Sequence, residues 1–310
     1  LLQAVVARLM KMQTNRKPHG MSRRTVVLLI LAMVSISCAA LFFRKAQPTH
    51  PLITSGLRLL IASLCLWPLV IRRVSSLGRD FWKAGCLAGL CYAVHFGAWV
   101  WSLNLTTVAA SVTLVTATPL MLGVIGLVTG TDAPSGRLWS ALTLAVIGVT
   151  VIGVHDLHSG DGQWIGDVLA LVGAAGMVGY LLIGRKCDPS EALPLITVAA
   201  TIGSVLLLGT ALLFGIPLAP ASNVSLFWIA MAALIPQLIG HTCLTFALRD
   251  ATPTSVAMST VGEPVGAALL AWLFLAEQVP MTMGIGCTFT IMAVFVSLRP
   301  SPSTDVNADQ

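Results

Sequence analysis

Charged side chains are scarce in this sequence. Asp, Glu, Lys and Arg make up 10% of its 310 residues, whereas a soluble domain has about 25%. The hydrophobic fraction is 56% and the mean hydropathy is +0.88. These values exclude an ordinary soluble protein and predict an all-α integral membrane protein, since a helix satisfies its own backbone hydrogen bonds in lipid.

Motifs for several common chemistries are also missing. The sequence has no Walker A, HExxH, GxSxG or dinucleotide-binding fingerprint, which argues against an ATP-driven pump. The seven cysteines show neither CxxC nor Cys/His zinc spacing. The loop at 155–161 holds two His and two Asp, but Gly160 and Gly162 give it no fixed scaffold, so a solvated turn is preferred. We therefore expect no cofactor and no metal site.

Long apolar runs are what the chain does have. A membrane-spanning helix needs about 20 apolar residues, and ten segments fit. With the N-terminus placed inside, 15 of the 18 Lys and Arg residues fall on the inner side, Arg44 and Lys45 fall outside, and Arg58 lies within a helix. The positive-inside rule then predicts a multi-pass protein of the cell (inner) membrane with both termini cytoplasmic. It also explains the net charge of +6 without nucleic acid. The predicted spans are residues 25–44, 52–71, 82–102, 107–129, 137–154, 164–184, 192–214, 225–247, 252–274 and 281–298.

The two ends of the chain are expected to lie outside these spans. Residues 1–24 form a basic N-terminal segment, interpreted as a start assigned too early or as a helix on the membrane surface. Residues 299–310 are rich in Ser, Pro and Asp, and we expect a disordered tail.

The sequence repeats itself at a nearly constant offset. FRK at 43–45 returns as GRK at 184–186, PLIT at 51–54 returns at 194–197, and TP at 118–119 is matched by EP at 263–264. The offsets are 141, 143 and 145 residues. We therefore predict two five-helix repeats, at 25–154 and 164–298. An odd number of helices inverts the second repeat relative to the first, which is a transporter architecture with its site at the repeat interface.

Two prolines occupy matching positions in these repeats. Pro119 and Pro264 each follow a polar residue near the middle of an apolar span. A proline there frees a carbonyl that another group must satisfy, and burying Glu263 in lipid would cost about 3 kcal/mol. We predict helix bends at Pro119 and Pro264 beside a transport pathway. A structural kink with a satisfied Glu263 is the alternative.

Polar residues also share faces of two equivalent spans. His95 and Trp99 lie four residues apart in the span 82–102, and Gln237 and His241 lie four residues apart in the span 225–247. Such faces should turn toward the bundle interior. We predict that these four residues and Glu263 line one substrate-binding cavity. Hydrogen-bonded core histidines are the alternative, and histidine also suits proton relay.

Arg58 is placed at the edge of this cavity, with three roles open. It could clamp freed carbonyls or pair with Glu263, bind a substrate carboxylate through its guanidinium fork, or snorkel toward the outer interface. Elsewhere, the spacings Gly85xxxGly89 and Gly262xxxGly266 indicate close helix packing.

Several of these stretches resemble the EamA family of the drug/metabolite transporter superfamily. They are LRLLIAS (57–63), HFGAWVWSLNLTTVAASVTLVTATPL (95–120), GDVLALVGAAGMVGYLLIGRK (166–186) and GHTCLTFALRDATPTSVAMSTVGEPVGAALLAWLFLAE (240–277). The resemblance covers about residues 25–298. It implies a ten-helix bundle with a central cavity and the export or exchange of small metabolites.

The leading hypothesis is a secondary transporter, not an enzyme, that moves a small polar or amphiphilic solute, amino acid-like or otherwise, by alternating access. Its partners would be that solute and the lipid bilayer. Proton coupling and a monomeric or homodimeric state stay open. The competing hypothesis is a polytopic accessory or scaffold protein or a membrane-embedded enzyme. An enzyme would need catalytic groups clustered at one interface, whereas the ionisable residues here lie within helices.

Overall fold

The computed structural model describes residues 22–106, 108–130, 134–154, 163–275 and 281–298, and the regular structure in these ranges is helical. Predictions for residues 1–21, the loop at 155–161 and the tail at 299–310 fall outside them. In chain order the helices are α2 (Arg23–Ser37), α3 (Ala39–Lys45), α4 (Pro51–Val74), α5 (Arg79–Leu105), α6 (Val108–Val115), α7 (Thr118–Thr129), α8 (Gly136–Val154), α9 (Gln163–Lys186), η1 (Pro189–Glu191), α10 (Ala192–Leu213), α11 (Asn223–Ala232), η2 (Ala233–His241), α12 (Thr242–Ala247), α13 (Pro253–Ser259), η3 (Thr260–Gly262), α14 (Glu263–Leu275) and α15 (Met281–Leu298).

Eight stretches of helix are long and apolar enough to cross a membrane. Large apolar side chains point outward from them, with exposed fractions of 70% for Leu69, 80% for Val128 and 87% for Leu213. Water would penalise such a surface, whereas lipid accommodates it. The chain is therefore a multi-pass membrane protein. The stretches are Arg23–Lys45, Pro51–Val74, Arg79–Leu105, Ala110–Thr129, Trp164–Lys186, Pro189–Leu213, Asn223–Ala247 and Pro253–Leu275.

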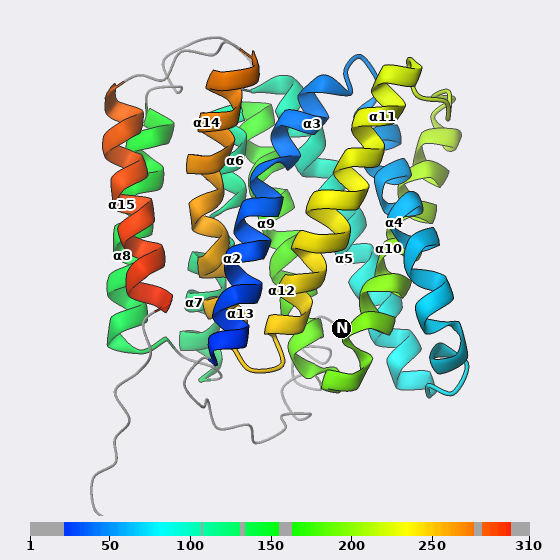
Figure 1. Ribbon diagram of the computed structural model, residues 1–310, viewed down its shortest axis with the longest axis horizontal. Helices are drawn as coiled ribbons and strands as arrows, with labels where there is room; N and C mark the ends of the chain where they lie inside the picture. Colours follow the sequence, from blue (N-terminus) through cyan, green and yellow to red (C-terminus); the bar gives the residue numbers. More distant parts are fainter. Residues whose placement is uncertain (1–21, 107, 131–133, 155–162, 276–280, 299–310) are drawn as a thin grey trace, which may run out of the picture.

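The other two predicted spans coincide with α8 and α15. Their apolar parts, Gly136–Gly148 and Gly284–Ser297, are shorter than the other eight, so a count of ten spans stays a prediction. These helices pack along each other at one end of the bundle (Figure 1). A side chain at Gly148 would collide with Thr290 of α15.

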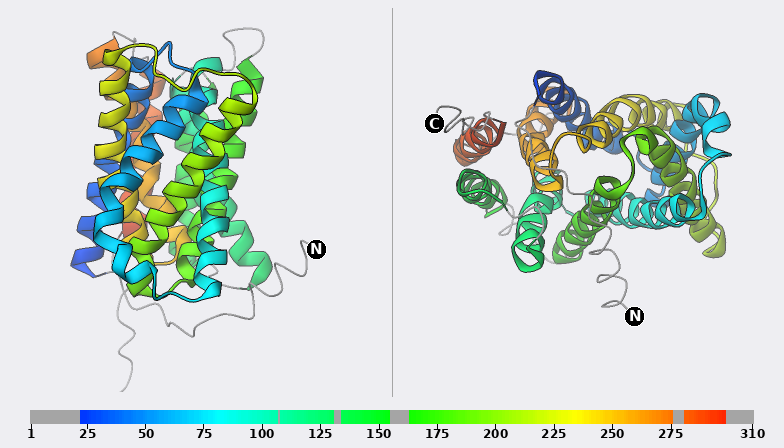
Figure 2. Two further views of the ribbon diagram at one scale, coloured as in Figure 1. Left: turned by 90° about the vertical axis from the view of Figure 1, so that its right-hand side faces the viewer. Right: turned by 90° about the horizontal axis from the view of Figure 1, so that it is seen from below.

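The helices run nearly side by side in an elongated bundle, with α8 and α15 at one end and α4 and α10 near the other (Figure 2). The most extensive contacts join α5 to α9, α8 to α15, α4 to α10 and α5 to α10, and α2 packs on η2 and α12. In addition, α13 packs on α7 and α14 packs on α6. Since α6 leads into α7 and α13 leads into α14, these two broken helices run in opposite directions.

Both GxxxG spacings lie at helix contacts. Side chains added at Gly85 and Gly89 of α5 would collide with Val198 and Ile202 of α10. Those at Gly262 and Gly266 would collide with Met33 and Ser37 of α2. Lipid gives helices no hydrophobic reason to associate, so close backbone packing of this kind holds the bundle together.

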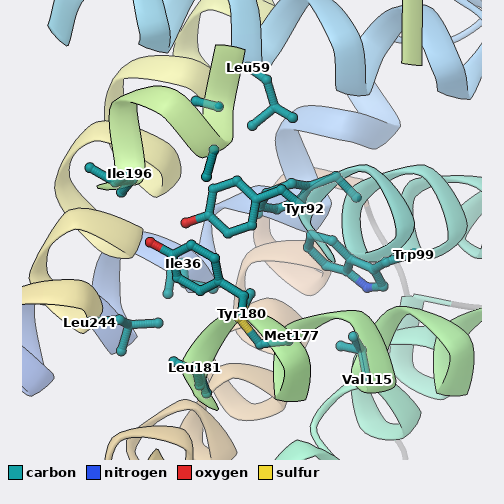
Figure 3. Packing of buried hydrophobic residues seen from close by; sticks show 14 of the residues in the cluster. Ile36, Leu59, Tyr92, Trp99, Val115, Met177, Tyr180, Leu181, Ile196 and Leu244 are labelled. Carbon is teal, nitrogen blue, oxygen red and sulfur yellow. The ribbon is translucent and has the colours of Figure 1, made fainter. Parts of the chain in front are cut away.

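Two stacked tyrosines lie in the centre of the core. The rings of Tyr92 (α5) and Tyr180 (α9) are 4.1 Å apart between centroids at 27°, and both hydroxyls turn to the same side (Figure 3). The Tyr180 hydroxyl is hydrogen-bonded to Thr245 Oγ1 at 2.7 Å. Leu59 and Ile196 are among the buried side chains around this pair (Figure 3).

Helices break directly before both matched prolines. Between α6 and α7 the Ala117 N–H bonds back to the Leu114 carbonyl, 3.1 Å away, and Pro119 follows in the first turn of α7. Between α13 and α14 the chain forms the short 3-10 helix η3, and Pro264 is the second residue of α14. Proline has no N–H and fits the first turn of a helix, so each proline starts a new segment.

Two further irregularities were not predicted. The first span breaks at Cys38, between α2 and α3, and the span from Asn223 contains the π-helix η2. Pro236 lies inside η2, and its missing N–H favours a wider helical turn. The two irregular segments are neighbours, since Gly240 of η2 packs on Ile36 and Ser35 of α2.

Candidate functional site

A cavity of about 30 Å3 lies where the broken helices meet. Thr116 and Thr118 line it from the α6–α7 break, and Thr260 and Glu263 line it from the η3–α14 break. Both halves of the chain therefore contribute to one site. The full lining is Ile36, His95, Trp99, Val115, Thr116, Thr118, Met177, Leu181, His241, Leu244, Ala257, Thr260 and Glu263.

His95 and Trp99 form one wall. The rings are stacked, with centroids 5.9 Å apart at 18°, as expected for side chains one turn apart on α5. His95 Nδ1 donates a hydrogen bond to the Gly173 carbonyl of α9 at 2.8 Å. That bond fixes the ring, and in the neutral imidazole it leaves Nε2 as an acceptor.

His241 faces His95 across the cavity. Their ring centroids are 6.1 Å apart at 68°. His241 is the last residue of η2, and its buried Nδ1 has no hydrogen-bond partner within the described ranges. Single π-turns occur frequently at functional sites, and here the turn ends on a cavity-lining imidazole.

Glu263 supplies the acid of the cavity. It begins α14, and its side chain is 5% exposed. It forms no hydrogen bond or ion pair with any described residue. The positive end of the α14 dipole favours negative charge at this position, so the carboxyl group is oriented by its helix while its oxygens stay available to a ligand.

Arg58 and Gln237 do not line this cavity, although the sequence analysis placed them with it. Both are buried, at 0% and 1% exposure. The Arg58 guanidinium carbon lies 4.2 Å from the ring centroid of Phe96 and 5.2 Å from that of Phe43. In the part of the chain that the structure describes, its three nitrogens have no hydrogen-bond partner, and no ion pair joins it to Glu263. Neither snorkelling nor a carbonyl clamp describes this arginine.

The model of the EamA-like transporter family matches residues 23–154 and 164–299. The chain belongs to that family. Because the match covers two consecutive copies, the two-repeat organisation is that of EamA-like transporters.

Structural comparison agrees on the fold of this EamA-like chain. A solved structure described as "Crystal structure of protein" superposes with a TM-score of 0.72 at 14% sequence identity, covering 89% of this chain and 98% of that one. At this identity the similarity shows the fold alone. A search of curated protein sequences gave no match.

Several lining residues of the EamA-like site were not foreseen. Met177 and Leu181 of α9, Ile36 of α2 and Leu244 of α12 are apolar, and in a membrane protein an apolar residue can face lipid or the interior equally well. The hydroxyls of Thr116 and Thr260 bond to the carbonyls three residues before them. These hydroxyls add hydrogen bonds to backbone carbonyls at the breaks.

Proposed function

We propose that this protein is a secondary transporter that exports or exchanges a small polar or amphiphilic metabolite by alternating access. The observation that carries this proposal is the cavity between two interrupted helices, one from each matched half of the family model. Sites at mid-membrane between discontinuous helices are the general arrangement of transporters built from repeats. The alternative is a polytopic accessory protein or membrane enzyme without transport.

The proposal includes ten spans in two inverted repeats, at 25–154 and 164–298. The opposite directions of α6–α7 and α13–α14 support it, as do the equivalent contacts of α5 with α9 and of α2 with η2 and α12. Inversion brings the third helix of one repeat against the first helix of the other in both cases. With the basic residues inside, both termini would be cytoplasmic in the cell (inner) membrane.

The size of the cavity fits one stage of such a cycle. A water molecule needs about 10–15 Å3, measured as the space open to its centre, so about 30 Å3 has room for about two waters. Sites for small molecules typically measure 300–1,000 Å3. The transport cycle therefore requires states in which the helices around the breaks separate and widen this space.

Glu263, His95 and His241 suit proton-coupled exchange. Each is a titratable group on the cavity wall, and an ionisable residue inside a membrane span is a usual element of proton relays. In this scheme Glu263 exchanges its proton with water when the site opens to either side.

Flux into liposomes tests the proposal. Purified protein is reconstituted with a panel of labelled metabolites, and uptake is compared with that of empty liposomes. We expect counterflow of at least one solute, and we expect His95→Ala to abolish it. Val94→Ala is the control and should retain the flux, because Val94 is adjacent to His95 in sequence but its side chain is exposed on the outer face of α5. Absence of flux across the panel, from protein that remains folded, would favour the accessory or enzymatic alternative.

A further inference from the structure

Arg58 is a buried cation without a hydrogen-bond partner among the described residues. Its side chain is 0% exposed, and the lack of a partner holds for Nε, Nη1 and Nη2 alike. A guanidinium offers five N–H donors, and leaving a charged group unsatisfied costs several kcal/mol in general. Phe96 and Phe43 offer their ring faces to the cation, but a ring contact does not replace hydrogen bonds to the N–H groups.

Two neutral groups in the same part of the core share this condition. Among the described residues, the buried Tyr92 hydroxyl and the two ends of the Gln237 amide form no hydrogen bond of full geometry, although Tyr92 lies close enough to interact with both Gln237 and Tyr180. Tyr92 lies within electrostatic reach of Arg58 and near the Gln237 amide. The phenol of Tyr180, stacked on Tyr92, is by contrast bonded to Thr245. Buried polar groups are rarely left unpaired, so an unpaired guanidinium beside two incompletely bonded donors, the Tyr92 hydroxyl and the Gln237 amide nitrogen, indicates a missing acceptor.

We propose that Arg58, Gln237 and Tyr92 form a carboxylate-binding subsite, so that the solute moved by this protein carries a carboxylate. This inference rests on the transport function proposed above. All three residues can donate hydrogen bonds, and a carboxylate only accepts them. Its two oxygens match the fork of an arginine, and its single charge neutralises one guanidinium. A phosphate dianion would leave one negative charge without a partner in this buried core.

Aromatic rings connect this subsite with the cavity. Phe96 lies under Arg58 and contacts His95 and His241, with ring centroids 4.5 Å and 5.1 Å apart. Phe43 touches Arg58 on one side and Trp99 on the other, at 5.6 Å between ring centroids. The subsite is therefore one ring away from the cavity. A solute whose carboxylate reaches Arg58 would place its remaining atoms between Trp99, Met177 and Leu181.

A second arrangement would satisfy Arg58 without a solute. Glu263 lies within electrostatic reach of Arg58, so the two could pair directly in another state of the protein. In that case no acid would depend on Arg58 for binding, and Glu263→Gln would remove the arginine's partner.

Thermal-shift titration of purified protein tests the subsite directly. The probes are matched acids and amides, 4-methylpentanoate with 4-methylpentanamide and L-leucine with L-leucinamide, together with inorganic phosphate. We expect at least one acid to raise the melting temperature, with an apparent Kd about tenfold or more below that of its amide, as for a hydrogen bond to a charged group. This preference should disappear in Arg58→Gln, weaken in Gln237→Leu and persist in Arg72→Gln, an exposed arginine at the end of the same helix.

Four results would overturn the subsite: amides that bind as well as acids, a stronger response to phosphate, an acid preference that survives Arg58→Gln, or no response of the wild-type protein to either acid. Liposome flux separates these failures from failure of the transport function. A protein that carries an uncharged or purely cationic solute, with rates unaffected by Arg58→Gln, is a transporter without this subsite.

Discussion

Arg58, a base, and Glu263, an acid, are both buried among the helices, yet no ion pair joins them. Arg58 sits between two phenylalanine rings, and Glu263 begins α14 on the wall of the cavity. Each charge lies within reach of the other's field. Two such groups favour states in which each gains a hydrogen-bonding partner, either from a third group such as a bound solute or from a movement of the helices that brings the two together.

The first prediction concerns the stability of the unliganded protein. Replacing even a buried ion pair by apolar side chains of similar volume is often neutral or stabilising by about 1–4 kcal/mol, and a buried charge without a partner contributes still less to the fold. Arg58→Met should therefore leave the melting temperature in detergent unchanged or raise it, while abolishing transport. The contrasting variant is Arg44→Met, which loses a 3.0 Å bond to the Thr106 carbonyl and should melt lower. A marked loss of stability in Arg58→Met would show that the arginine supports the fold.

A second prediction concerns the cavity acid. Glu263→Gln keeps the shape of the side chain but removes its proton exchange, so flux should lose its dependence on pH while solute binding stays measurable. His95, His241 and Arg58 are the other ionisable or charged groups near it. Proteoliposome flux at several pH values gives the measurement. An unchanged pH profile, accompanied by a lower melting temperature, would instead assign Glu263 a structural role.

The third prediction addresses helix packing. A Cβ at Gly176 of α9 would lie 2.7 Å from the His95 backbone nitrogen and 2.9 Å from the Cys91 carbonyl oxygen of α5, and backbone atoms cannot move aside cheaply. Gly176→Ala should separate the two helices, disturb the His95–Gly173 bond and lower both melting temperature and flux. Gly209→Ala is the control, since nothing lies within 4 Å of its added Cβ. It should be neutral or slightly stabilising, because alanine favours helix by about 1 kcal/mol over glycine. Equal effects of the two substitutions would contradict this packing.

Much of the site could be predicted because polar groups are costly in lipid. His95, Trp99, His241 and Glu263 were assigned to one cavity on that argument, and the structure gathers these four around it. Gln237 was assigned by helical spacing, which identifies a face but not a depth. It lies one turn from His241 and near Tyr92 instead. Phe43 and Phe96 are apolar, so the cost of polar groups in lipid does not reveal that their rings contact Arg58. The π-helix η2 and the break at Cys38 depend on tertiary packing that local sequence does not encode.

The fourth prediction tests the orientation in the membrane. If both termini are cytoplasmic, a cysteine introduced at Asn223, at the start of α11, should react with an impermeant maleimide added outside intact cells. One at Ser75, at the end of α4, should react only after permeabilisation. The native Cys187 should contribute little, since burial, followed by the nearby Glu191, raises the pKa of its thiol to about 12 and thiolate is the reactive form. Swapped labelling would reverse the topology.

The last prediction concerns the two proline breaks. At each one a threonine hydroxyl bonds to the carbonyl three residues before it, Thr116 to Thr113 and Thr260 to Ala257, and both breaks border the cavity. Alanine at Pro119 or Pro264 restores an N–H and allows the two segments to join into one straighter helix. The variants should insert and fold normally, by expression and melting temperature, while flux falls substantially. Pro68→Ala is the control, because Pro68 lies inside α4 and does not border the cavity. If all three substitutions reduce flux in proportion to protein yield, the matched breaks serve insertion and not the transport cycle.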